Sequence, residues 1–90
     1  MSSNNRMAEL QELLKKHEDW STGEVKQTQE GMVVTVRQDT HTKEADADAS
    51  LDELLKDLKA NSFKHSKPKK QTGRFEGYAY EFDVNIEPKK

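Results

Sequence analysis

The stretch “YAYEFDVNI”, residues 78–86, alternates large apolar and small or polar side chains without a break. Successive side chains of a β-strand point to opposite faces, so this pattern predicts a long strand with one buried face and one wetted face. Phe75 has the opposite parity, and a bulge near Gly77 would bring it into phase. Pro88 is expected to end the strand. The face predicted to be buried carries Tyr78, Tyr80, Phe82, Val84 and Ile86.

Two amphipathic helices are predicted upstream of this strand. In “MAELQELLKKHEDW”, residues 7–20, the apolar side chains recur at helical spacing, which favours a helix over about residues 5–19. Trp20, at its end, is expected to fold back onto the core. In “SLDELLKDLKAN”, residues 50–61, Ser50 and Glu53 match a capping box at the start of a leucine-rich helix. That helix presents Leu51, Leu54, Leu55 and Leu58 on one stripe.

A β-hairpin is predicted between the two helices. The segments “EVKQTQ” and “MVVTVRQ” flank “EG” at residues 30–31, where Gly31 can adopt the positive φ of a tight turn. The first segment carries Val25 as its strongly apolar residue, so it is expected at the edge of the sheet.

These elements give the order α-β-β-α-β within a single α+β domain of residues 1–90. The predicted fold is a three-stranded antiparallel sheet with both helices packed on one face. Residues 1–4 and 87–90 are expected to be frayed, and residues 61–73 are expected to form a flexible basic loop. The predicted core joins Leu54, Leu55 and Leu58 to Tyr80, Phe82 and Val84.

Composition narrows the class of protein. Hydrophobic residues make up 31% of the chain and charged residues 36%, which is enough for one modest core. The absence of cysteine excludes disulfides, thiolate metal sites and cysteine nucleophiles. No apolar stretch approaches the ~18 residues of a membrane span, and “MSSNNRMAEL” has no signal-like apolar region. We therefore expect a cytoplasmic protein.

No metal site, cofactor site or catalytic centre is predicted. The segment “DADASLDELLKD”, residues 46–57, faintly matches a calcium-binding loop, but Leu51 occupies the position that needs glycine. His17, His41 and His65 are too far apart in sequence to form a helical ligand pair. Nucleotide-binding and hydrolase motifs are absent. A small enzyme is the third choice of function, behind two binding functions.

The basic segment “NSFKHSKPKKQTGR”, residues 61–74, contains no acidic residue. Its cations, with Phe63 and Phe75 on either side, are the residues that a nucleic-acid-binding surface would use to contact phosphates and stack on bases. The net charge of the chain is −2, however, which gives no general attraction to a polyanion. We favour a mobile, solvated connector and keep nucleic-acid binding as the alternative. The cations concerned are Lys64, Lys67, Lys69, Lys70 and Arg74.

The preferred function is a small protein-binding accessory or regulatory factor, of the kind found among phage or plasmid proteins. The polar face of the predicted sheet is its candidate binding surface, where Gly77 and Ala79 would allow another chain to approach closely. A partner protein is expected, with the chain itself a monomer or weak homodimer. The predicted binding residues are Val33, Thr35, Arg37, Ala79 and Glu81.

The hairpin followed by “ADASLDELLKDLKAN”, residues 47–61, is similar in outline to the HicB-type antitoxin domain, in which a hairpin leads into a short leucine helix. The likeness covers residues 23–60. The glycine-rich turn and the proline pattern of that family are absent, so no family is assigned and no function is carried over.

Overall fold

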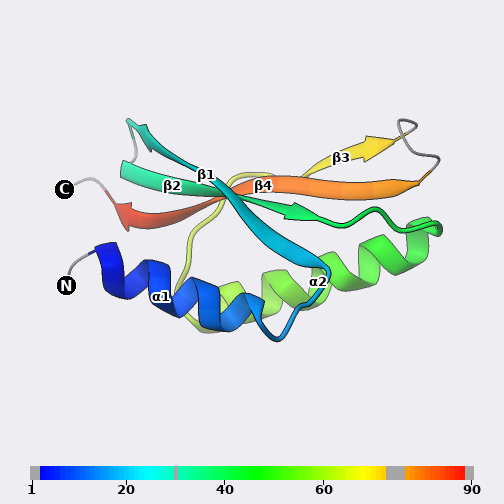
Figure 1. Ribbon diagram of the computed structural model, residues 1–90, viewed down its shortest axis with the longest axis horizontal. Helices are drawn as coiled ribbons and strands as arrows, with labels where there is room; N and C mark the ends of the chain where they lie inside the picture. The colour runs from blue at the N-terminus through cyan, green and yellow to red at the C-terminus, as the bar shows by residue number, and fades with distance from the viewer. Residues whose placement is uncertain (1–2, 30, 73–76, 89–90) are drawn as a thin grey trace.

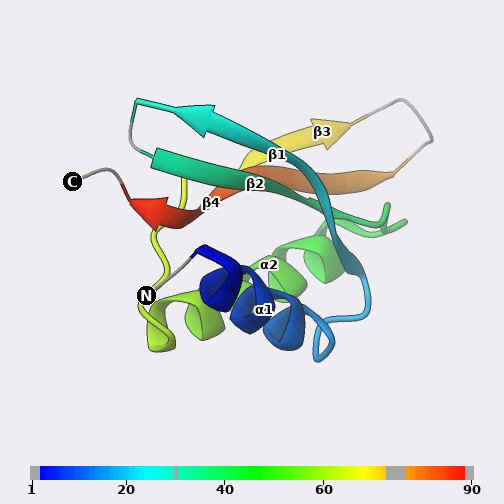
Figure 2. The same ribbon diagram turned by 60° about the vertical axis from the view of Figure 1, so that its left-hand side comes forward.

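The computed structural model describes residues 3–29, 31–72 and 77–88. Helices α1 (Ser3–Leu14) and α2 (Glu44–Ala60) form one layer beneath an antiparallel sheet, as Figure 1 and Figure 2 show. The strands are β1 (Trp20–Thr28), β2 (Gly31–Gln38), β3 (Lys69–Thr72) and β4 (Tyr78–Pro88), in the order β1-β2-β4-β3. The predicted α+β class is confirmed. The predicted count of three strands is wrong, because the described sheet has four.

The additional strand, β3, arises from the segment that was predicted to be a loop. Residues 69–72 pair with residues 78–81 of β4, and just before them Ser66 N–H donates to the carbonyl of Asp83 (2.8 Å). The segment therefore follows the free side of β4. Its lysines and Pro68 argued against a strand, yet both residue types are tolerated at the edge of a sheet, where they discourage pairing with other chains.

The helix boundaries also differ from the predicted ones. α1 ends at Leu14, and Trp20 begins β1 with its ring buried. α2 begins at Glu44, so Ser50 lies inside the helix and the predicted capping box is wrong. The alanines at 45, 47 and 49 are strong helix formers, and acidic residues in the first turn suit the helix dipole. The calcium-loop-like segment 46–57 is continuous helix.

The core lies between the sheet and the two helices. Phe82 packs edge-to-face against Trp20, with ring centroids 5.6 Å apart. Leu55 and Tyr80, predicted as core residues, are only partly buried at its margin, because Leu54 occupies the central position of the α2 stripe. The buried cluster consists of Leu10, Leu13, Leu14, Trp20, Val34, Val36, Leu51, Leu54, Leu58, Phe63, Phe82, Val84 and Ile86.

One buried polar side chain joins three elements at the margin of this core. Gln38, at the end of β2, donates from Nε2 to the carbonyl of Ala47 in α2 (3.0 Å). Its Oε1 accepts a hydrogen bond from the backbone N–H of Tyr80 in β4 (3.1 Å). Both ends of the amide are satisfied, so its burial does not leave a polar group without a partner.

The C-terminus of α2 is closed by a Schellman motif built on a serine. Ser62 has φ 63° in the left-handed region, where glycine is usual. Its N–H donates to the Lys59 carbonyl (3.1 Å), and the N–H of Phe63 donates to the Leu58 carbonyl (2.9 Å). Arg6 of α1 donates to the Ser62 carbonyl (3.0 Å), and its guanidinium lies 3.9 Å from the ring centroid of Phe63. These contacts bind α1 to the end of α2.

Replacing Ser62 with glycine should therefore stabilise the protein. A side chain in the left-handed region costs roughly 1–2 kcal/mol, part of which glycine loses again through its greater freedom when unfolded. We expect a net gain of about 0.5–1 kcal/mol in the free energy of unfolding, measured by urea titration. Ser62→Ala is the matched control, because it keeps the Cβ atom and should give no gain. A Ser62→Gly variant no more stable than Ser62→Ala would contradict the role assigned to this conformation.

Candidate protein-binding face

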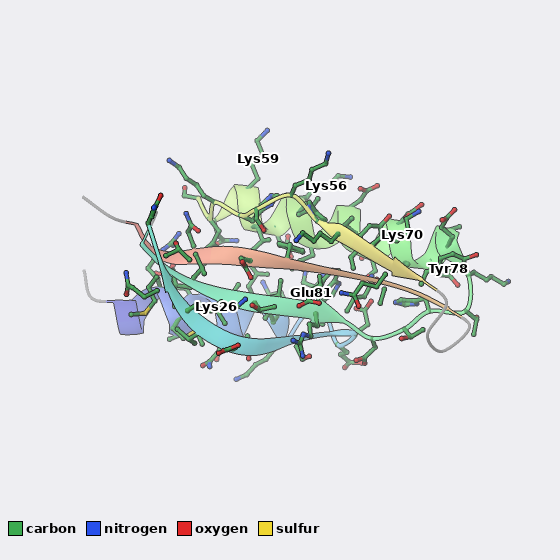
Figure 3. The ribbon with its side chains drawn as sticks, turned by 90° about the horizontal axis from the view of Figure 1, so that it is seen from above. Lys26, Lys56, Lys59, Lys70, Tyr78 and Glu81 are labelled. Atoms are coloured by element: carbon green, nitrogen blue, oxygen red, sulfur yellow. The ribbon has the colours of Figure 1, made fainter. Side chains whose placement is uncertain are left out.

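The face of the sheet turned away from the helices is covered by no described element, and we call it the outer sheet face (Figure 1). Figure 3 views this face from above and shows Lys26 of β1 and Glu81 of β4 on it. The pairing of the strands places Ser21, Lys26, Val33, Thr35, Arg37, Lys69, Gln71, Ala79, Glu81, Asp83 and Asn85 on this face.

The five residues predicted to bind a protein all lie on the outer sheet face. Arg37 is paired with Glu81, and Ala79 lies further along β4, opposite Gln71 of β3. Val33 and Thr35 have only 4% and 2% of their surface exposed, because they are in the central strand β2 between longer side chains. A partner would therefore contact mainly the polar side chains around them. Val34, on the opposite face, is buried as well, so burial alone does not distinguish the two faces of β2.

The side chains of the outer sheet face are joined by cross-strand contacts. Thr35 Oγ1 donates to Asp83 Oδ1 (2.8 Å), linking β2 to β4. Glu81 accepts from Arg37 Nε (3.3 Å) and from Gln71 Nε2 (2.9 Å), so its carboxylate links β2, β4 and β3. Such contacts restrict the rotamers of these side chains before any partner arrives, which lowers the entropic cost of binding.

A hollow of about 380 Å³ crosses the outer sheet face. Among the described residues of its lining Asp83 supplies the carboxylate, and the other polar side chains carry hydroxyls and amides. The hollow could not be found by sequence reasoning, because its lining comes from three strands, from Gln29 after β1 and from the segment before β3. It is lined by Thr28, Gln29, Val33, Ser66, Asp83 and Asn85.

Gly77 does not leave room for another chain, contrary to the prediction. A Cβ atom built on Gly77 would overlap Thr40 Cγ2 and would lie 2.6 Å from the His41 carbonyl oxygen. The loop after β2 fills this space, and His41 and Tyr78 exchange backbone hydrogen bonds of 2.8 Å. The close approach allowed by this glycine is therefore made within the chain.

The residues of the predicted nucleic-acid site are only partly brought together. Lys69 lies on the outer sheet face, whereas Lys70 lies on the helix side and donates to Glu44 of α2 (2.6 Å), which raises the pKa of Lys70. Lys64 and Lys67 are exposed in the segment that precedes β3. Phe63, expected to stack on bases, is buried in the core beneath Arg6. Arg74 and Phe75 lie outside the described residues, and the expected mobility of residues 64–74 remains a prediction.

A cluster that the sequence did not reveal joins Asp19, His41 and Ser50. Asp19 Oδ2 accepts from His41 Nε2 (2.8 Å) and from the Ser50 hydroxyl, while Trp20 Nε1 donates to Ser50 Oγ (2.9 Å). Partial burial raises the pKa of Asp19, but the hydrogen bonds from Ser50 and His41 outweigh it, so this pKa lies below its ordinary value.

This cluster differs from a catalytic triad, in which the histidine lies between the serine and the acid. In this protein the Ser50 hydroxyl donates a hydrogen bond directly to the Asp19 carboxylate, and none of its described hydrogen bonds goes to His41. The arrangement of a serine–histidine pair is therefore not present among these three side chains. The cluster holds the start of β1 against α2, a structural role.

A second histidine of the described residues also contacts an acidic side chain. His17 Nε2 lies 2.6 Å from Asp57 Oδ2, which ties the chain after α1 to α2. In residues 3–29, 31–72 and 77–88, no group of three or more potential ligands could hold a metal ion. Within those same residues, no helix is both long and apolar enough to cross a membrane. Comparison with family models, curated proteins and solved structures found no match for the chain.

Proposed function

We propose that this protein is a non-catalytic binding module that holds a segment of another protein against its outer sheet face. The proposal is carried by one observation, a hollow with a carboxylate in its lining that crosses a face which no described helix covers. The cross-strand contacts through Glu81 and Asp83 keep the surroundings of this hollow in place. An accessory or regulatory role, rather than a catalytic one, is in keeping with this arrangement.

The lining of the hollow suits a basic side chain of the partner. Asp83 provides a negative charge, and the carbonyl oxygens of Gln29 and Asn85 can accept hydrogen bonds. A guanidinium or ammonium group offers several donors and no acceptor, so it matches a site rich in acceptors. Arg37 and Lys26 lie elsewhere on the same face and can pair with acidic residues on either side of that basic side chain.

The experiment is affinity capture from a host lysate with the immobilised protein and two matched variants. Asp83→Asn keeps the shape of the hollow but removes its charge, so we expect recovery of the partner to fall about tenfold, as for the loss of a charge-assisted hydrogen bond. Lys56→Glu is the control, because Figure 3 shows Lys56 on α2, away from the outer sheet face. A partner recovered equally by all three proteins would place the binding surface elsewhere.

The alternative function, nucleic-acid binding by residues 64–74, is favoured by the exposed lysines that follow the free side of β4. It is weakened by the burial of Phe63. Titration with single- and double-stranded DNA and RNA at several salt concentrations separates the two functions. We expect no salt-sensitive binding at micromolar protein. Salt-sensitive binding that decreases when Lys64, Lys67 and Lys69 become glutamine would establish the alternative instead.

A further inference from the structure

The two edges of the sheet differ in their charge. At the β3 edge, residues 61–72 hold four lysines and no acidic residue. The unpaired backbone groups of an edge strand attract other strands, and a row of lysines prevents this by repelling a second copy of itself. β1 forms the other edge, and its nine residues contain one acid and one base, Glu24 and Lys26. This second edge therefore lacks the row of like charges that protects the first.

Between these two charges, β1 exposes an apolar side chain. Val25 is 46% exposed. Among the described residues, it is the large hydrophobic side chain classed as exposed. It pairs with Val34 of β2, which is fully buried, so Val25 lies at the open margin of the core. A strand placed beside β1 would cover this side chain and extend the core outward.

The sequence around Val25 is complementary to itself in the antiparallel direction. When Val25 lies opposite Val25 of a second copy, Glu24 of each chain lies opposite Lys26 of the other. A shift of the register by two residues keeps each side chain on the same face of the sheet. Such a shift places either Glu24 opposite Glu24 or Lys26 opposite Lys26 of the second copy. Opposite charges stabilise such cross-strand pairs and like charges destabilise them, so the two charges select the register centred on Val25.

We propose that β1 pairs with β1 of a second copy of this chain, around a two-fold axis at Val25. Such an interface is isologous, which means that both copies contribute the same residues. It joins the two four-stranded sheets into one continuous sheet, and both outer sheet faces lie on the same side of it. The bulge between Thr22 and Val25 interrupts the regular pairing of the strand, so the interface is short. The dimer is accordingly weak and reversible. This inference does not depend on the proposed function.

The test is sedimentation equilibrium between about 10 µM and about 1 mM protein, a range that detects micromolar dissociation constants. The parent should dimerise with a dissociation constant of about 100 µM, as expected for an interface well below standard size. Glu24→Lys and Lys26→Glu each turn two opposite-charge pairs into like-charge pairs, so each should weaken dimerisation about tenfold or more. The double variant Glu24→Lys/Lys26→Glu restores opposite pairs in the same register, and it should dimerise within about threefold of the parent.

Lys69→Glu, at the other edge, is the control and should leave dimerisation unchanged. Fluorescence of Trp20, the one tryptophan of the chain, and circular dichroism verify that each variant is folded. A parent that stays monomeric at about 1 mM would overturn the proposal. A double variant that associates no better than the single variants would also overturn it. A loss of dimerisation in Lys69→Glu would overturn it as well, because each of these two results excludes the β1 register described above.

Discussion

Truncating Phe82 to alanine should lower the free energy of unfolding by about 3–5 kcal/mol. The side chain is 3% exposed and packs edge-to-face against both Trp20 and His65. Its removal loses the transfer free energy of the ring and leaves a cavity that rigid neighbours cannot fill. The loss is a large fraction of the total stability of a small domain, about 5–15 kcal/mol. Urea unfolding followed by Trp20 fluorescence and by circular dichroism measures it.

Val25→Ala is the matched control for this truncation, because it removes apolar atoms from a half-exposed site on the edge strand. At low protein concentration, where association plays no part, we expect a change within about 0.5–1 kcal/mol. If Phe82→Ala cost no more than Val25→Ala, the core would not lie between β4 and the helices. The same comparison tests the prediction made from the alternation of residues 78–86.

The second large effect is expected at Gly77, where an alanine has no space. The added methyl group would meet the Thr40 side chain and, at 2.6 Å, the backbone oxygen of His41. The threonine can rotate, but the carbonyl cannot move without disturbing the pairing of His41 with Tyr78. We expect Gly77→Ala to destabilise the protein by about 2–3 kcal/mol, at the upper end of the cost of overpacking. Thermal unfolding should show a midpoint more than about 8 °C lower.

Gly23→Ala is the control for Gly77→Ala, since both add the same methyl group, at Gly23 inside β1 and at Gly77 just before β4. At Gly23 the nearest atoms to a built Cβ are the Thr35 carbonyl oxygen at 3.4 Å and Thr35 Cβ at 3.7 Å, which are ordinary contacts. We expect this variant to unfold within about 0.5 kcal/mol of the parent. Equal losses in the two variants would show that the loop after β2 does not pack on Gly77 as described.

The strands with strong alternation could be predicted from the sequence, and β3 could not. In β4, Phe82, Val84 and Ile86 are buried as their parity requires, because a sheet with one covered face leaves little freedom of register. β3 is short, and its lysines and nearby proline carry no periodic signal. It is a strand because β4 offers it a row of unpaired backbone groups, which is a tertiary effect that local propensity does not contain.

The candidate site was predictable only in outline. Strand parity placed Arg37 and Glu81 on one face, and the register then brought them together. The hollow beside Asp83 and the cluster of Asp19, His41 and Ser50 depend on which strands and loops become neighbours, and this is set by the order β1-β2-β4-β3. The spacing of residues along the chain does not determine these contacts, so no local motif could have indicated them.

The central position of β4 has a consequence for the order in which this protein can fold during synthesis. A nascent chain that has emerged only as far as residue 72 contains α1, β1, β2, α2 and β3. It lacks β4, the strand that lies between β2 and β3 in the sheet. It also lacks Phe82, Val84 and Ile86, so the leucines of both helices have only the β1–β2 hairpin on which to pack. Native folding must wait until residues 78–88 have left the ribosome, and until then the apolar side of the β1–β2 hairpin is open to chaperones.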